Sequence, residues 1–156
     1  MTPYQEIYEL FFDRIEKDVD FFISSLPEDE LQMIINTRAK SLLVDAVVAF
    51  KSFGLREDIF QRDDELEFFE NILTDTEKKI IADLMVEHYI AKDALVRIKN
   101  MDIYFGEKDV KLFIPPMVRK QLSDFHKDLK TENKTSVSNY KSRDRTTGKL
   151  IPLEDW

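Results

Sequence analysis

The stretch Leu73-Thr74-Asp75-Thr76-Glu77-Lys78-Lys79-Ile80-Ile81-Ala82-Asp83-Leu84-Met85 decides the fold class of this chain. Thr74 and Glu77 form a capping box, in which each side chain accepts a hydrogen bond from a backbone N–H at the start of a helix. The residues that follow place one apolar face at helical spacing: Ile80, Ile81, Leu84, Met85 and His88. The sequence therefore predicts a long amphipathic helix that continues, with a bend, as far as Met101.

An earlier helix is expected at the N-terminus. Thr2 can cap it, Pro3 suits its first position, and Gln5 completes a capping box. Apolar residues then recur at helical spacing, so we expect this helix to run to about Lys17.

A second helix is expected from Pro27 to a stop at Gly54, since glycine is favoured just after the last helical residue. Its apolar stripe is wide: Leu31, Ile34, Ile35, Leu42, Leu43, Ala46, Val47, Ala49 and Phe50. A single amphipathic helix needs only one apolar face. The sequence therefore predicts that Leu43 and Val47 contact a neighbouring molecule.

The segment Arg62-Asp63-Asp64-Glu65-Leu66 is expected to be a polar turn that leads into a short helix at Phe68-Phe69. Its adjacent carboxylates lack the ligand spacing of a calcium loop, so the turn is interpreted as structural. We expect Arg62 to pair with a carboxylate, within the subunit or across an interface, where such a pair fixes register.

The composition changes near residue 130. A last helix is expected from Pro115-Pro116 to Leu129. Residues 1–129 carry a net charge of −10, whereas residues 130–149 carry +4 and are rich in Thr, Ser and Asn. The predicted fold is therefore an all-α compact bundle of about four main helices over residues 1–130, followed by an extended basic arm over residues 131–156 that ends in an apolar hook.

Three interpretations of the arm remain open: contact with nucleic acid phosphates, docking on a partner, and disorder. Docking is preferred because aromatic anchors dominate protein interfaces. The residues expected to dock are Tyr140, Arg143, Arg145, Leu150, Ile151, Leu153 and Trp156.

The composition of the 156 residues also excludes several classes of site. The chain has no cysteine, two histidines and three glycines, so thiolate chemistry and glycine-rich phosphate loops are excluded. His88 lies on an apolar helix face and is interpreted as a satisfied, buried or interface histidine. We expect no catalytic site, no cofactor and no metal. No targeting segment or membrane span is expected, and the net charge is −8.

Several segments resemble the small helical head–tail connector (neck or adaptor) proteins of tailed bacteriophages of Gram-positive hosts. The resemblance covers about residues 4 to 130 and is carried by Tyr4-Gln5-Glu6-Ile7-Tyr8, Arg62-Asp63-Asp64-Glu65-Leu66 with Phe69, Leu73-Thr74-Asp75 with Glu77, Ala82 with Leu84-Met85-Val86-Glu87, and Glu107-Lys108-Asp109-Val110-Lys111. The arm from Thr131 has no counterpart in it.

The resemblance implies a structural virion protein that is assembled in the host cytoplasm and located in the neck of the particle. Such proteins form a ring with themselves, usually dodecameric, beneath the portal protein and next to a tail or stopper (tail-completion) protein. Asp63, Asp64 and Glu65 are expected at an interface together with Arg62. DNA passes through the ring without specific binding, since an acidic ring repels the duplex. The alternative is a cytoplasmic helical regulatory module that binds nucleic acid or a partner protein with its basic arm.

Overall fold

The computed structural model describes residues 1–15, 27–55, 58–95 and 116–152. Their elements, in chain order, are β1 (Thr2–Pro3), α1 (Tyr4–Ile15), α3 (Glu28–Ser52), β2 (Arg62–Asp63), β3 (Phe68–Phe69), α4 (Asp75–Tyr89), the π-helix η1 (Ile90–Leu95) and α7 (Pro116–Lys141). The fold is a compact helical bundle with one very small sheet, which confirms the predicted all-α class.

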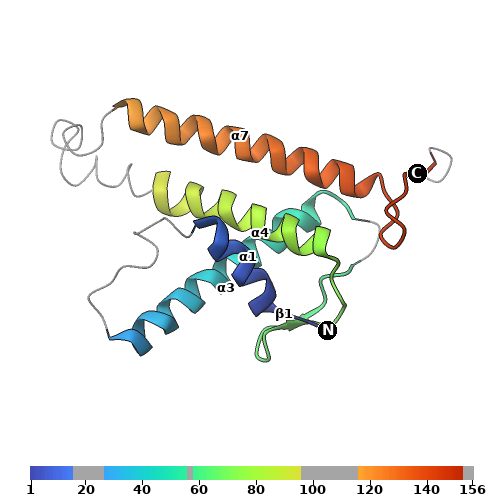
Figure 1. Cartoon of the computed structure of the whole chain (residues 1–156), viewed down its shortest axis with the longest axis horizontal. Coiled ribbons are helices and arrows are strands. Elements are labelled where there is room, and N and C mark those ends of the chain that lie inside the picture. The colour runs from blue at the N-terminus through green and yellow to red at the C-terminus, as the bar shows by residue number, and fades with distance from the viewer. Residues whose placement is uncertain (16–26, 56–57, 96–115, 153–156) are drawn as a thin grey trace.

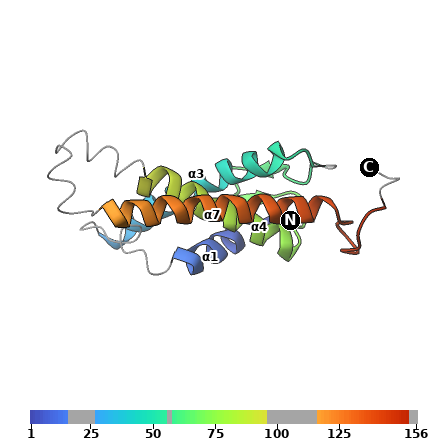
Figure 2. The ribbon, with the colours of Figure 1, turned by 90° about the horizontal axis from the view of Figure 1, so that it is seen from above.

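Helix α4 is the centre of the bundle, and it packs against α1, α3 and α7. α7 lies along one side of α4, while α1 and α3 lie on the other side (Figure 1). Viewed from above, α1 lies on one side of α7, while α3 crosses beneath α7 and ends on the other side (Figure 2). The largest fully buried apolar side chains come from α1, α3, α4 and the segments around β3: Tyr4, Ile7, Phe11, Leu43, Val47, Phe50, Phe60, Phe69, Ile81 and Met85.

The predicted cap at the N-terminus is wrong. Thr2 lies in β1 and pairs with Phe69 of β3. Its hydroxyl accepts a hydrogen bond from the Leu73 amide (2.8 Å) and donates one to the Asn71 carbonyl (3.2 Å). The side chain of Thr2 thus provides hydrogen-bond partners for the backbone that leads into α4. Helix α1 begins at Tyr4 without a cap from Thr2.

The other predicted helix limits are mostly confirmed. Thr74 Oγ1 accepts from the Glu77 amide (3.3 Å), and a Glu77 carboxylate oxygen accepts from the Thr74 amide (2.7 Å), so the capping box exists. α3 begins directly after Pro27, and Gly54 follows its last turn with φ of +71°. The predicted bend after α4 is the π-helix η1, while the expected continuation to Met101 lies outside the described residues.

The predicted short helix at Phe68-Phe69 is wrong, because this segment is β3, the middle strand of the sheet. β2 and β3 form a hairpin in which Arg62 pairs with Phe69 and Asp63 pairs with Phe68. The Asp63 carboxylate accepts from the two backbone amides that follow in the turn, both at 2.9 Å. Such aspartate turns reverse the chain, and fully buried Phe69 then holds β3 against the core.

The predicted helix end at Leu129 is also wrong, since α7 continues to Lys141. Asn133 and Val137 are buried on the side of α7 that faces α4. The Asn133 amide donates to the Asp83 carbonyl (3.2 Å) and to the Glu87 carboxylate (2.9 Å). These contacts outweigh the weak helix propensity of Ser, Thr and Asn, so residues 131–141 belong to the helical body and are not an extended arm.

Candidate functional site

Glu77 at the start of α4 binds the last turn of α7 and the segment that follows it. Its side chain is fully buried (0% exposed). Arg145 donates to it from Nε (2.6 Å) and from Nη2 (3.1 Å), and the Tyr140 hydroxyl donates to the same carboxylate. Arg145 also donates to the Ile72 carbonyl (2.6 Å). We call Glu77, Tyr140 and Arg145 the C-terminal clamp.

The clamp keeps the buried carboxylate of Glu77 ionised. Burial alone would raise the pKa of Glu77, but hydrogen bonds from Arg145, Tyr140 and the Thr74 amide outweigh it, and the pKa lies below its ordinary value. The pKa of Tyr140 is raised by burial and by its bond to the carboxylate. The Tyr140 ring packs edge-on against Phe50 with ring centroids 5.5 Å apart. The clamp therefore joins the end of α7 to α4 and α3.

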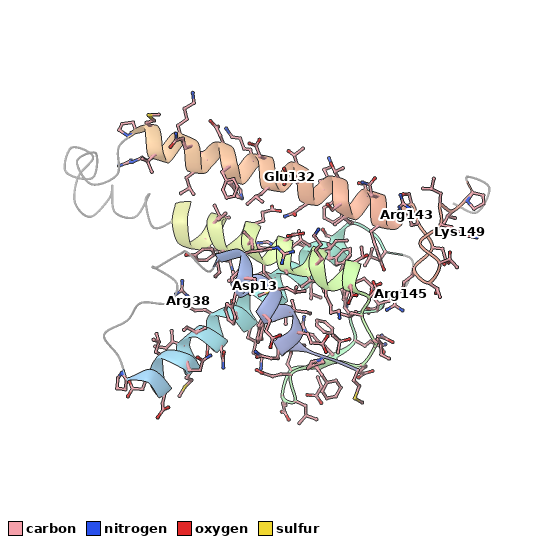
Figure 3. All side chains as sticks on the ribbon, in the orientation of Figure 1. Asp13, Arg38, Glu132, Arg143, Arg145 and Lys149 are labelled. Atoms are coloured by element: carbon pink, nitrogen blue, oxygen red, sulfur yellow. The ribbon has the colours of Figure 1, made fainter. Side chains whose placement is uncertain are left out.

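A compact turn follows the clamp. Arg143 and Leu150 form a β-bridge, and the Asp144 carboxylate accepts from the Thr146 amide (3.1 Å) and from the Thr147 amide (2.7 Å). Figure 3 shows Arg143, Arg145 and Lys149 gathered at this end of the molecule. The turn therefore presents basic side chains beside the body that it closes on.

Two cavities flank this turn. One of about 200 Å³ is lined by apolar Leu55, Ile59 and Ile151 together with Tyr140 and Arg143. The other cavity, of about 550 Å³, lies between the first turns of α4, the last turns of α7 and the turn that follows α7. Its lining includes Thr76, Lys79, Ser136, Asn139 and Gly148. Both share residues with the clamp, so both would change shape if the clamp opened.

The predicted docking residues therefore have different positions. Tyr140 and Arg145 contact this chain's own Glu77, and Ile151 lines a cavity against the body. Arg143 is exposed, and Leu150 is 68% exposed. Leu153 and Trp156 lie outside the described residues. The acidic partner of Arg145 is thus Glu77 of the same chain.

The residues of the predicted polar turn are brought together at the hairpin. Arg62 Nε lies 3.1 Å from the Asp64 carboxylate, so Arg62 pairs within the subunit. The Tyr4 hydroxyl donates to Asp64 (2.7 Å), and Lys40 donates to the Asp64 carbonyl (2.5 Å) and to Glu67 (3.0 Å). The bond from Tyr4 and the charge of Arg62 lower the pKa of Asp64 although its burial opposes this. The base of the hairpin is thus anchored to α1 and α3.

The tip of the hairpin faces solvent. Glu65 is exposed, and Leu66 is 70% exposed. Residues 63–67 carry four carboxylates and no basic group. We call residues 62–67 the acidic hairpin.

The prediction that Leu43 and Val47 form an outer contact surface is wrong. Their exposed fractions are 0% and 1%, and they belong to the core. The wide stripe of α3 is covered within the chain, because α4 packs on it and the ring of Phe60 lies 5.1 Å from the ring of Phe50. The stripe therefore indicates two internal neighbours of α3 and no outer face at these positions.

His88 is half-buried, and its Nε2 has no hydrogen-bond partner among the described residues. Of the three interpretations, satisfied, buried or interface, the structure argues against the first, since no hydrogen bond to Nε2 is present in the described part of the chain. Desolvation lowers the pKa of His88, although nearby Asp45 and Glu87 act in the opposite direction.

The described residues contain no group of three or more His, Asp or Glu side chains that could hold a metal ion. In the same part of the chain, no helix has both the length and the apolar character to cross a membrane. Comparisons of the whole chain with protein families, with curated proteins and with solved structures find no match.

The sequence did not reveal the C-terminal clamp. Glu77 was recognised only as the partner of Thr74 in the capping box, and Arg145 only as one basic residue of an arm. The two residues are 68 positions apart, and local spacing carries no signal of such a contact. The charge contrast between the body and residues 130–149 was the only sequence signal that pointed to it.

Proposed function

We propose that this chain is a structural virion protein that forms an adaptor ring between the portal and the tail, continues the DNA channel and seals the head–tail joint. The observation that carries the proposal is the acidic hairpin. This segment, which is one of those that carry the resemblance to head–tail connectors, folds as an anchored projection whose apolar tip, Leu66, is 70% exposed.

The geometry of the hairpin suits contact with a partner. Tyr4 and Lys40 hold its base, so little conformational freedom remains to be lost when the tip docks. The tip presents one large apolar side chain, Leu66, between Glu65 and Glu67 in sequence, a combination that suits an apolar centre with a polar rim in a protein interface. The proposed occupant of this surface is the portal protein or the adjacent subunit of the ring.

The charge of the chain suits passage of DNA better than its capture. The net charge is −8, and Arg145 and Arg143 donate hydrogen bonds to Glu77 and to the Gly148 carbonyl within the chain. Tight binding to duplex requires basic groups that neutralise phosphates. The alternative is a regulatory module with a nucleic-acid-binding arm. Because two arginines of the arm are bonded within the chain, fewer of its basic groups are available to bind phosphates than the sequence alone suggested.

The test is native mass spectrometry of the purified full chain mixed with rings of the portal protein from the same phage genome. We expect several copies of the chain on each portal ring. Leu66→Asp should reduce the number bound, whereas Ile72→Asp, which alters an apolar side chain 74% exposed outside the hairpin, should not. Absence of binding to the portal, together with salt-sensitive binding to duplex DNA, would replace the adaptor with the regulatory module.

A further inference from the structure

The smaller of the two cavities, of about 200 Å³, lies where the turn after α7 meets the chain that follows α3. Its apolar lining comes from Leu55, Ile59 and Ile151, and Tyr140 adds an aromatic side chain. An apolar cavity of about 150 Å³ is already large enough to hold benzene. The space therefore suits one aromatic side chain.

The backbone leads towards this cavity where the described part of the chain ends. The Ile151 amide donates to the Ser142 carbonyl (2.9 Å), beside an antiparallel β-bridge. In an antiparallel pair the second segment runs back along the first, so residues 151–152 head back towards Lys141 at the end of α7, which also lines the cavity. The residues that follow in the sequence are Leu153-Glu154-Asp155-Trp156.

Trp156 is close to the cavity along the chain. It follows Ile151, which lines the cavity, by five residues. An extended chain spans at most ~3.6 Å per residue, so the two Cα atoms are never more than about 18 Å apart. Short linkers hold a tethered group at an effective concentration of the order of millimolar. This segment therefore reaches the cavity more readily than a separate molecule does.

The rim of the cavity carries two basic side chains whose charges are not neutralised. Lys141 donates to the Phe53 carbonyl (2.5 Å) and Arg143 donates to the Gly148 carbonyl (3.0 Å). Both line the cavity, and neither forms an ion pair with a carboxylate of the described residues. The rim therefore favours a segment that carries negative charge.

The other charged residues of the lining do not cancel this preference. Arg145 is paired with Glu77, so the charges of these two residues balance. The Asp144 carboxylate accepts from the backbone amides of Thr146 (3.1 Å) and Thr147 (2.7 Å) within the turn. With Lys141 and Arg143 against Asp144, the lining is net positive.

We propose that Trp156 occupies this cavity of its own chain, with Glu154 and Asp155 beside Lys141 and Arg143. The segment after Pro152 has two acidic residues and no basic residue, so its charge complements the rim. Trp buries a large apolar area, and its ring is the best partner for a nearby cation. The docked residue ties the turn after α7 to the chain after α3 and holds the C-terminal clamp closed.

Trp156 is the only tryptophan of the chain, so its fluorescence tests the proposal directly. In the isolated full chain we expect emission at shorter wavelength, and weaker quenching by acrylamide, than in the same chain unfolded in urea. Arg143→Glu should remove most of this protection, because it places a negative charge beside Glu154 and Asp155. The matched control, Lys149→Glu, changes a basic residue of the same turn that is not part of the described lining of the cavity, and it should keep the protection (Figure 3).

A charge exchange separates loss of the contact from damage to the turn, since Arg143 also bonds the Gly148 carbonyl. Glu154→Arg and Asp155→Arg, added to Arg143→Glu, should restore the protection. Fluorescence of the native chain equal to that of the unfolded chain, protection that Arg143→Glu leaves unchanged, or no restoration by the exchange would overturn the proposal. Protection that appears only as the protein concentration rises would assign Trp156 to the cavity of a neighbouring copy and would also overturn it. These measurements use the chain without the portal, so their outcome is independent of the proposed ring.

Discussion

Replacement of Glu77 by alanine tests whether the C-terminal clamp stabilises the fold. The substitution removes the partner of the Thr74 amide and therefore one half of a capping box, which costs about 1 kcal/mol. It also removes the acceptor for Arg145 and for the Tyr140 hydroxyl, and hydrogen bonds to charged groups are worth about 1.5–3 kcal/mol. The side chain of Arg145 is 31% exposed, so hydrogen bonds to water can replace part of the lost hydrogen-bond energy. We expect a net loss of about 3 kcal/mol from the free energy of unfolding, against a total of about 5–15 kcal/mol for a typical domain.

The assay is urea unfolding at neutral pH, followed by far-ultraviolet circular dichroism. Asp75→Ala is the matched control, because Asp75 lies in the same first turn of α4 but its side chain is fully exposed. The control should keep an unfolding free energy close to that of the unchanged chain. If Glu77→Ala costs less than about 1 kcal/mol, which is the cap alone, the clamp contributes nothing to stability and the reasoning fails.

Three other changes probe the charge of Glu77, the hydroxyl of Thr2 and the last turns of α7. The stabilisation by ionised Glu77 is the difference in unfolding free energy between the unchanged chain and Glu77→Gln. It should be complete above pH ~4.5 and shrink as the pH falls towards the lowered pKa of Glu77 in the folded state. A difference that grows on acidification would contradict the clamp. Thr2→Val should cost about 1 kcal/mol in urea unfolding, because it leaves the buried Leu73 amide without its acceptor, and an unchanged midpoint would refute this. Deletion of residues 131–156 should destabilise the helical body, because it removes buried Asn133 and Val137. Deletion of residues 152–156 should cost less stability, because it leaves both of these residues in place. Equal stability of the two truncated chains in thermal unfolding would show that the last turns of α7 are dispensable.

The sequence predicted those elements whose signals are local. The capping box of Thr74 and Glu77, the start of α3 after Pro27 and the stop at Gly54 each depend on residues a few positions apart, and the structure confirms them. The all-α class followed from helical periodicity in the same way.

Two of the errors involve partners distant in sequence, whereas the hairpin at Phe68-Phe69 was missed although its partners, Arg62 and Asp63, are local. Thr2 was expected to cap a helix, but β3 offered a strand partner 67 residues later. α7 was expected to end at Leu129 because Thr, Ser and Asn follow, but α4 supplied burial for Val137 and hydrogen-bond partners for Asn133. Tertiary contacts override weak local propensity, so these features could not be read from neighbouring residues.

The candidate sites follow the same rule. The sequence singled out Arg62 to Leu66 and the basic segment after residue 130, and both are structured elements in the fold. It could not show that the arm's Arg145 binds the chain's own Glu77, or that α4 packs on the stripe of α3 that contains Leu43 and Val47. The exposed apolar residues of α3 and α7 became apparent only once burial was known.

The central claim is that this chain is a repeated structural component of a phage neck. The most direct test is quantitative mass spectrometry of purified particles of a phage whose genome carries this sequence, with the copy number of this chain measured against that of the portal protein. The account predicts that the chain is present in ring-scale copy number, close to that of the portal. Its absence from particles, or a single copy in each, would contradict the adaptor ring.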